Sequence, residues 1–173
     1  MASYLLNSFT DFPSTCGSSS CSVSSEFYLY YQNVRGINNK LSNLYNSLLG
    51  CNHDVICLSQ TWLISSVLNT EFCPNDFQIV RSDRNLQKMG VSKGEGDLIV
   101  IRRQYASFPL DLSSKGFDSL QFTGVVGAKC SLSHLTLYVF VIYIQPSSSA
   151  DEYDLLMNLL SNLEELYKIN VRM

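Results

Sequence analysis

The feature that most constrains the fold is a strand, helix and strand pattern between Glu26 and Leu63. Phe27 to Tyr31 is an aromatic run of strand length, and Gly36 follows shortly after it. From Ile37 to Gly50 the apolar residues recur at helical spacing, and Val55 to Leu58 then form a short, continuous apolar run. Such a run is typical of a strand that is buried on both faces. The segment therefore predicts two neighbouring strands joined by a covering helix.

Each of these two strands is followed by a polar residue, Asn33 after the first and Gln60 after the second. A helical crossover favours parallel strands, and the carboxyl ends of parallel strands open onto the same edge of a sheet. Open α/β sheets bind their ligands at that edge. We therefore expect Asn33 and Gln60 to lie close together in a site. An Asx-turn cap on the strand end is an equally good interpretation of Asn33.

The rest of the chain continues the pattern of strands and helices. The segment 64–76 reads as a loop with a helical turn. Asp151 to Lys168 is an amphipathic helix, with Ser149 or Asp151 as its N-terminal cap. Short strands are predicted at Phe77 to Arg81 and at Leu98 to Ile101. An antiparallel hairpin is predicted in which Ser119 to Cys130 pairs with Leu135 to Ile144. The predicted fold class is α/β, with a mixed sheet and covering helices.

Composition is that of an ordinary globular domain. The chain has 173 residues, of which 46% are hydrophobic, which is enough for one domain with a substantial core. Its formal net charge of −3 lacks the basic footprint that drives binding to phosphate backbones. The six cysteines show neither a C-x-x-C pair nor the Cys/His spacing of a zinc site, so we interpret them as reduced thiols, mostly in the core.

Targeting signals and membrane spans are not predicted. No stretch approaches the roughly 20 apolar residues of a membrane span, and the N-terminus lacks the pattern of a signal peptide. We expect an intracellular protein, nuclear or cytoplasmic, without a membrane partner. Residues 1–25 are poor in charge and Ser-rich in their second half, which predicts a disordered leader before a folded domain over residues 26–173.

Four motifs, in order, resemble a known family. They are Q-N-V-R-G after the first strand, D-V-I-C-L-S-Q-T-W-L around the second, and then G-E-G-D-L-I-V-I and V-I-Y-I-Q-P. Together they resemble the endonuclease/exonuclease/phosphatase family, and most closely the endonuclease domain of jockey-type non-LTR retrotransposon polyproteins. The resemblance runs from Phe27 to the C-terminus. It implies a four-layer α/β sandwich whose parent activity is Mg²⁺-dependent nicking of DNA.

The resemblance also gives roles to particular residues. Gln60 stands at the position of the family's principal metal ligand, which is a glutamate. Asn33 matches a residue that hydrogen-bonds a phosphate oxygen or a metal-bound water, and Tyr143 matches a tyrosine whose hydroxyl contacts the scissile phosphate. Gln60 offers a neutral oxygen in place of a carboxylate, so we expect it to hold Mg²⁺ poorly. Asp97 is a neighbour that could compensate, although we expect it at a strand entry on the solvent side.

Several of these residues also have structural interpretations. Tyr143 can be a core aromatic, and Trp62 is expected to pack at the end of the second strand. His53 and His134 match no histidine motif of the family, so we interpret both as structural or solvated. Basic side chains that could form a DNA-facing rim, but read better as scattered surface charges, are Arg35, Arg81, Arg84, Lys88, Lys93, Arg102 and Arg103.

Two later motifs of the family, G-D-x-N and S-D-H, do not occur in the chain. We therefore expect an incomplete sandwich in which the first of two sheets is present and one sheet face is exposed. The chain is then a retrotransposon-derived endonuclease-like domain that does not nick DNA. DNA is the partner that the resembled family implies. Two alternatives remain: a binding module whose exposed face docks a protein partner or a second copy, and a translated mobile-element remnant without activity.

Overall fold

The computed structural model describes residues 27–84, 96–120, 123–132 and 135–167. The predicted leader and His134, Lys88 and Lys93 lie outside the described residues. The strands are β1 Leu29–Asn33, β2 Val55–Ser59, β3 Phe77–Ser82, β4 Asp97–Arg102, β5 Ala106–Pro109, β6 Thr123–Ser131 and β7 Thr136–Ile144. The helices are α1 Leu41–Gly50 and α3 Ala150–Tyr167, with short 3₁₀ turns at Asn69–Glu71, Ser113–Lys115 and Phe117–Ser119.

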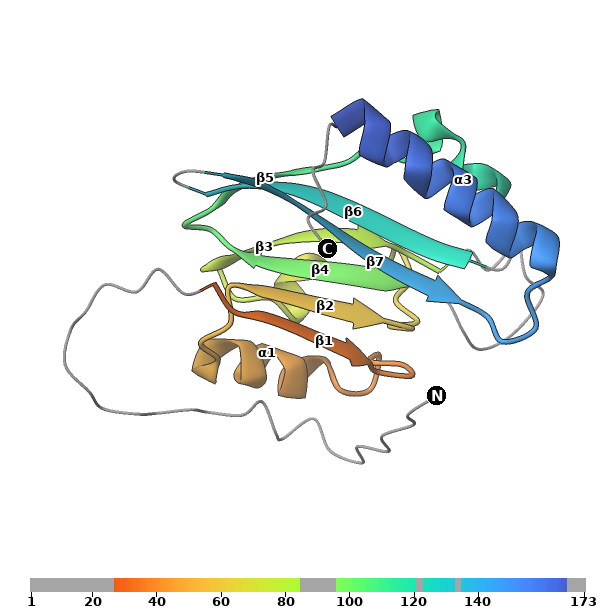
Figure 1. The fold of residues 1–173 in the computed structure, drawn as a ribbon. Helices are drawn as coiled ribbons and strands as arrows, with labels where there is room; N and C mark the ends of the chain where they lie inside the picture. The colour runs from red at the N-terminus through yellow and green to blue at the C-terminus, as the bar shows by residue number, and fades with distance from the viewer. Residues whose placement is uncertain (1–26, 85–95, 121–122, 133–134, 168–173) are drawn as a thin grey trace.

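The elements form four layers, as Figure 1 shows: helix α1, a four-stranded sheet, a three-stranded sheet, and helix α3. The four-stranded sheet has the order β1-β2-β4-β3, and the three-stranded sheet has the order β5-β6-β7. The expectation that only the first sheet is present is therefore wrong. The hairpin of β6 and β7 does not extend the first sheet but forms a second sheet, which covers most of its inner face.

Three apolar clusters hold these layers together. Leu44 and Leu48 of α1 pack on Ile56 of β2 and cover the outer face of the four-stranded sheet. Between the sheets lies a second cluster of fully or nearly fully buried residues, Val55, Cys57, Ile99, Ile101, Val126, Ala128, Cys130, Val139 and Val141. Helix α3 covers the outer face of the three-stranded sheet through a third cluster that includes Leu156 and Leu163. Burial of apolar area of this kind is the dominant favourable contribution to folding.

Strand pairing sets the positions of the predicted site residues. β1 and β2 are parallel, as the crossover helix predicted, and Asn33 pairs with Ser59. β4 is antiparallel to β2, so its first residue, Asp97, also pairs with Ser59. In the second sheet, Gly124 of β6 pairs with Tyr143 of β7.

Most predicted elements are present, with shifted ends. The first helix begins at Leu41, because Ile37 lies in a preceding turn where its carbonyl accepts the Lys40 N–H at 2.8 Å. Ser149 caps α3, since its Oγ accepts the Glu152 N–H at 3.3 Å. Strand β5 was not predicted, because its sequence A-S-F-P is short and has no alternation.

The cysteine interpretation is confirmed for the described residues. Cys51, Cys57 and Cys130 are buried free thiols, and Cys73 is a partly buried one. Burial raises the pKa of Cys57 to about 12 and that of Cys73 to about 11, so both are inert thiols near neutral pH. No helix in the described part of the chain is long and apolar enough to cross a membrane.

Candidate functional site

Five residues from both sheets meet where the apolar layer between the sheets ends. Asn33, Ser59 and Asp97 lie side by side across the ends of β1, β2 and β4. Gln60 directly follows β2, and Tyr143 lies near the end of β7, where it interacts with Gln60 and Asp97. We call Asn33, Ser59, Gln60, Asp97 and Tyr143 the strand-end cluster.

Gln60 and Tyr143 join the two sheets at this cluster. The Gln60 side chain is hydrogen-bonded to the Tyr143 hydroxyl. Burial raises the pKa of Tyr143, the Arg35 guanidinium opposes the rise, the nearby Asp97 carboxylate adds to it, and the hydrogen bond with Gln60 opposes it. Tyr143 is therefore a neutral phenol at physiological pH, and its interaction with Gln60 is one between two uncharged groups.

Asp97 does not lie on the solvent side, so that expectation is wrong. Only 1% of the residue is exposed. Its carboxylate lies directly against Gly124 of β6, at a distance that leaves no room for a Cβ at that position. The second sheet therefore covers the start of β4, and a glycine there makes room for the carboxylate.

Asn33 lies at the exposed rim of the cluster. Ser59, between Asn33 and Asp97, is fully buried, and its Oγ lies 2.9 Å from the hydroxyl of Tyr31. The basic residue Arg35 interacts with the cluster through Tyr143. Arg102 instead donates to the carbonyls of His53 and Cys51 at the other end of the sheet.

The backbone around the cluster is strained. Within the described residues, the non-glycine residues with positive φ are Arg35 at 48°, Gln60 at 55° and Trp62 at 58°. All three follow the ends of β1 and β2. Left-handed conformations of this kind cost of order 1–3 kcal/mol each and persist only where their surroundings hold them, most often at functional sites.

Contacts between the two strand ends hold this backbone in place. The Gly36 and Ile37 N–H groups donate to the Gln60 and Thr61 carbonyls at 2.7 and 2.9 Å, and the Thr61 N–H donates to Gly96 at 2.8 Å. As predicted, Trp62 packs at the strand end, where its ring lies so close to Gly36 that no Cβ fits there. Gly36 itself has a φ of 96°, which favours glycine.

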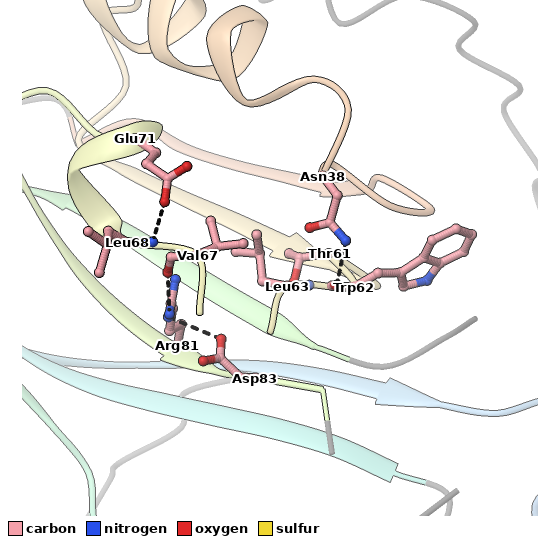
Figure 2. Close-up of polar contacts among 9 residues, drawn as sticks. All are labelled: Asn38, Thr61, Trp62, Leu63, Val67, Leu68, Glu71, Arg81 and Asp83. Atoms are coloured by element: carbon pink, nitrogen blue, oxygen red, sulfur yellow. Dashed lines mark hydrogen bonds and ion pairs between the residues drawn. The ribbon is translucent and has the colours of Figure 1, made fainter. Parts of the chain in front are cut away.

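The loop after Gln60 is fixed from both sides, as Figure 2 shows. On one side, the Asn38 side chain donates to the Trp62 carbonyl at 3.0 Å. On the other, Arg81 donates to the Val67 carbonyl at 2.8 Å and pairs with Asp83 at 3.0 Å. The Leu68 N–H donates to Glu71 at 2.7 Å within the loop. The cluster is therefore built on a well-braced scaffold.

The donors of the cluster do not fit a magnesium site. Mg²⁺ takes anionic oxygens in octahedral geometry and keeps several of its waters. Here the amides and hydroxyls are neutral, and the carboxylate of the cluster, Asp97, is packed under the second sheet. Across the described residues, no group of three His, Cys, Asp or Glu side chains is arranged to hold a metal ion. The cluster is suited instead to hydrogen-bonding a polar group at the exposed side chain of Asn33, beside Arg35.

Comparison with known protein families and with curated proteins finds no match. Comparison with solved structures finds the endonuclease domain of TRAS1, a telomere-specific non-LTR retrotransposon, with a TM-score of 0.53 and 8% identity over 80% of this chain and 54% of that one. D. rerio TDP2 complexed with single-strand DNA product gives a TM-score of 0.53 and 16% identity over 80% and 55% of the two chains.

These comparisons establish the fold. The chain has an endonuclease/exonuclease/phosphatase-type fold, as the motifs implied. A humanized D. rerio TDP2 with 14 mutations gives the same result, with a TM-score of 0.50 and 17% identity over 85% of this chain and 62% of that one. The chain spans between half and two thirds of the length of these structures.

Sequence reasoning missed Ser59 and the packing of Asp97, and it interpreted Arg35 as one of several scattered surface charges. Ser59 carried a usable signal, since it precedes Gln60 at the end of a buried strand. The position of Asp97 carried none, because it depends on contact with Gly124, which is distant in the chain.

Proposed function

We propose that this chain is a retrotransposon-derived endonuclease-like domain that does not nick DNA. Support for the parent class comes from the fold and from the ordered motifs of the strand ends. Loss of activity is proposed because the position of the metal-binding glutamate holds Gln60. Metal-dependent phosphodiester hydrolysis requires a cation to polarise the phosphate and to activate water, and this cluster has no accessible carboxylate for that cation.

The observation that carries the proposal is the position of Gln60, a neutral amide directly after β2 that interacts with Tyr143. An uncharged side chain therefore stands at the point where a ligand carboxylate would have to face a metal ion. Asp97 does not replace that carboxylate, because it is buried against Gly124. The scaffold of the parent site is thus present with its charge removed.

The test is nicking of supercoiled plasmid by the purified chain. We expect no conversion to open circles in Mg²⁺ or Mn²⁺. Conversion that depends on the metal and is lost in Asn33→Ala contradicts the proposal, because it shows a working site at the strand ends. Asn39→Ala, at an exposed position in the turn before α1, is the matched control.

A second candidate function is that of a binding module, and the exposure of β1 favours it. Leu29 is 50% exposed and Tyr31 is 54% exposed, although both point to the same face as the layer between the sheets. Large apolar side chains in such a position favour a docking surface. DNA is proposed as a partner only because the parent class acts on DNA.

A further inference from the structure

The two sheets have different widths, and the difference leaves a step along one flank. β7 packs over β2 and β4, and β6 packs over β4 and β3. The four-stranded sheet therefore extends one strand further, by β1, than the three-stranded sheet does. Leu29 and Tyr31 are exposed because no described strand lies above them. We call the free edges of β1 and β7, with these two side chains, the open flank.

Both edges of the open flank are suited to pairing with another strand. The backbone groups of Tyr28 and Val34, which flank β1, face β2, as their hydrogen bonds with Val55 and Ser59 show. By alternation, those of Leu29, Tyr31 and Asn33 face outward. Neither β1 nor β7 contains a charged residue or a proline. The opposite edges are protected in the usual ways, by Arg81 in β3 and by the shortness and Pro109 of β5.

The strands of the open flank run in the same direction. β1 is parallel to β2, and the residues after both strands meet Tyr143 near the end of β7. The arrows of β1, β2 and β7 accordingly point the same way in Figure 1. Consider a second copy generated by a twofold axis parallel to these strands. Its three-stranded sheet lies at the level of the first copy's four-stranded sheet, and its strands keep the same direction.

We infer that a second copy of this chain closes the open flank. About such a twofold axis, β1 of each copy lies beside β7 of the other and over the other copy's β1. Each four-stranded sheet then continues into the partner's three-stranded sheet, and Leu29 and Tyr31 of the two copies face each other. The contact is self-complementary and closed, which is the commonest form of homo-oligomer. Edge-to-edge pairing of two β1 strands leaves the step open, so it is the poorer solution.

The uncharged edges fit this occupant, and the size of the contact predicts its strength. The two paired edges are uncharged, so two copies meet without repulsion between like charges. The paired strands contribute five residues of β1 and nine of β7 from each copy. A standard interface uses about 20–30 residues a side, so the contact is small and we expect a reversible dimer. The inference gives the second candidate function its partner and does not depend on whether the chain cuts DNA.

Sedimentation velocity over a range of concentrations tests the inference on the full chain. We expect a reversible equilibrium between the 19.5 kDa monomer and a species of twice that mass. Leu29→Lys and Tyr31→Lys should each weaken dimerisation at least about tenfold, because a lysine at a paired edge opposes strand addition. Phe108→Lys is the control, since Phe108 is 60% exposed on β5, at the opposite edge of the second sheet. Far-UV circular dichroism establishes that each variant is folded.

Hydrogen exchange at low and high concentration identifies the arrangement. We expect protection to rise with concentration on both β1 and β7. Protection that rises on β1 alone shows edge-to-edge pairing and overturns the inference. The inference is also overturned if the chain stays monomeric, if neither lysine variant affects the dimer, or if irregular aggregation replaces a discrete dimer. A monomer leaves the second candidate function in need of another partner, while the nicking assay reports separately on the first.

Discussion

The two ends of the four-stranded sheet each contain a buried aspartate, and the two differ in what surrounds them. Asp54, before β2, is 6% exposed and accepts hydrogen bonds from the Tyr28 N–H, the Tyr105 hydroxyl and the Gln104 side chain at 2.8, 2.8 and 3.3 Å. Asp97, the first residue of β4, is 1% exposed, and its described neighbours include a glycine and other residues of the strand-end cluster. The first end is a conventional hydrogen-bonded brace. The second has strained backbone, which clusters at functional sites, and a carboxylate that a glycine makes room for.

The largest effect should come from removing the brace. Asp54→Ala leaves three partly buried donors without their acceptor, and a hydrogen bond to a charged group contributes about 1.5–3 kcal/mol. We expect the free energy of unfolding, measured with urea, to fall by about 3 kcal/mol. Asp76→Ala, at an exposed position, should change it by less than about 0.5 kcal/mol. Equal effects of the two substitutions contradict the role of Asp54.

A smaller effect is expected from filling the space above Asp97. Gly124→Ala places a Cβ against the carboxylate and should destabilise the fold by about 1–3 kcal/mol. Gly50→Ala is the matched control, because no atom lies within 4 Å of the Cβ it adds. A double-mutant cycle with Asp97→Ala sharpens the result. Strict additivity of the two changes argues against the contact.

The strain at the strand ends predicts a stabilising substitution. Arg35→Gly removes a Cβ from an exposed residue with a φ of 48°. A left-handed conformation costs a non-glycine residue roughly 1–2 kcal/mol, so we expect unfolding to become harder by about 1 kcal/mol. Asn39→Gly, an exposed neighbour without positive φ, should be neutral or destabilising. The prediction fails if both glycines destabilise the protein alike.

The smallest expected effect is on the pH dependence of stability, and it comes from His53, beside Asp54. Burial lowers the pKa of His53 below its ordinary value of 6.5, and Arg102 lowers it further against the opposing effect of Asp54. The unfolded chain therefore takes up this proton more readily, so the stability due to neutral His53 is present above pH 6.5 and is lost as the pH falls. In His53→Asn, the urea midpoint should fall less between neutral and mildly acidic pH. An unchanged fall means that other groups cause the acid sensitivity.

Local patterns predicted the parts of the fold that depend on neighbouring residues. The apolar runs at Val55 to Leu58 and Leu98 to Ile101 are strands, and the helical spacing before Gly50 is a helix. The second sheet was predicted as a hairpin but not as a separate layer, because periodicity does not say which sheet a hairpin joins. Positive φ at Arg35 and Gln60 had no signal either, since neither residue type favours it.

The candidate site was predicted in the same uneven way. Asn33 and Gln60 were placed at one edge from the parallel crossover, and their strand ends do lie side by side. The hydrogen bond between Gln60 and Tyr143 depends on how the sheets stack, which no local pattern encodes.

The proposed function requires that the strand-end cluster has the scaffold of the parent site but no affinity for a divalent cation. Electron paramagnetic resonance of Mn²⁺ tests it directly, since bound Mn²⁺ loses the sharp signal of the free ion. We predict that the folded chain leaves the free signal of millimolar Mn²⁺ unchanged, and that Gln60→Glu, which restores a carboxylate beside Asn33 and Tyr143, reduces it. A reduced signal with the natural chain, abolished by Gln60→Ala or Asp97→Asn, contradicts the account.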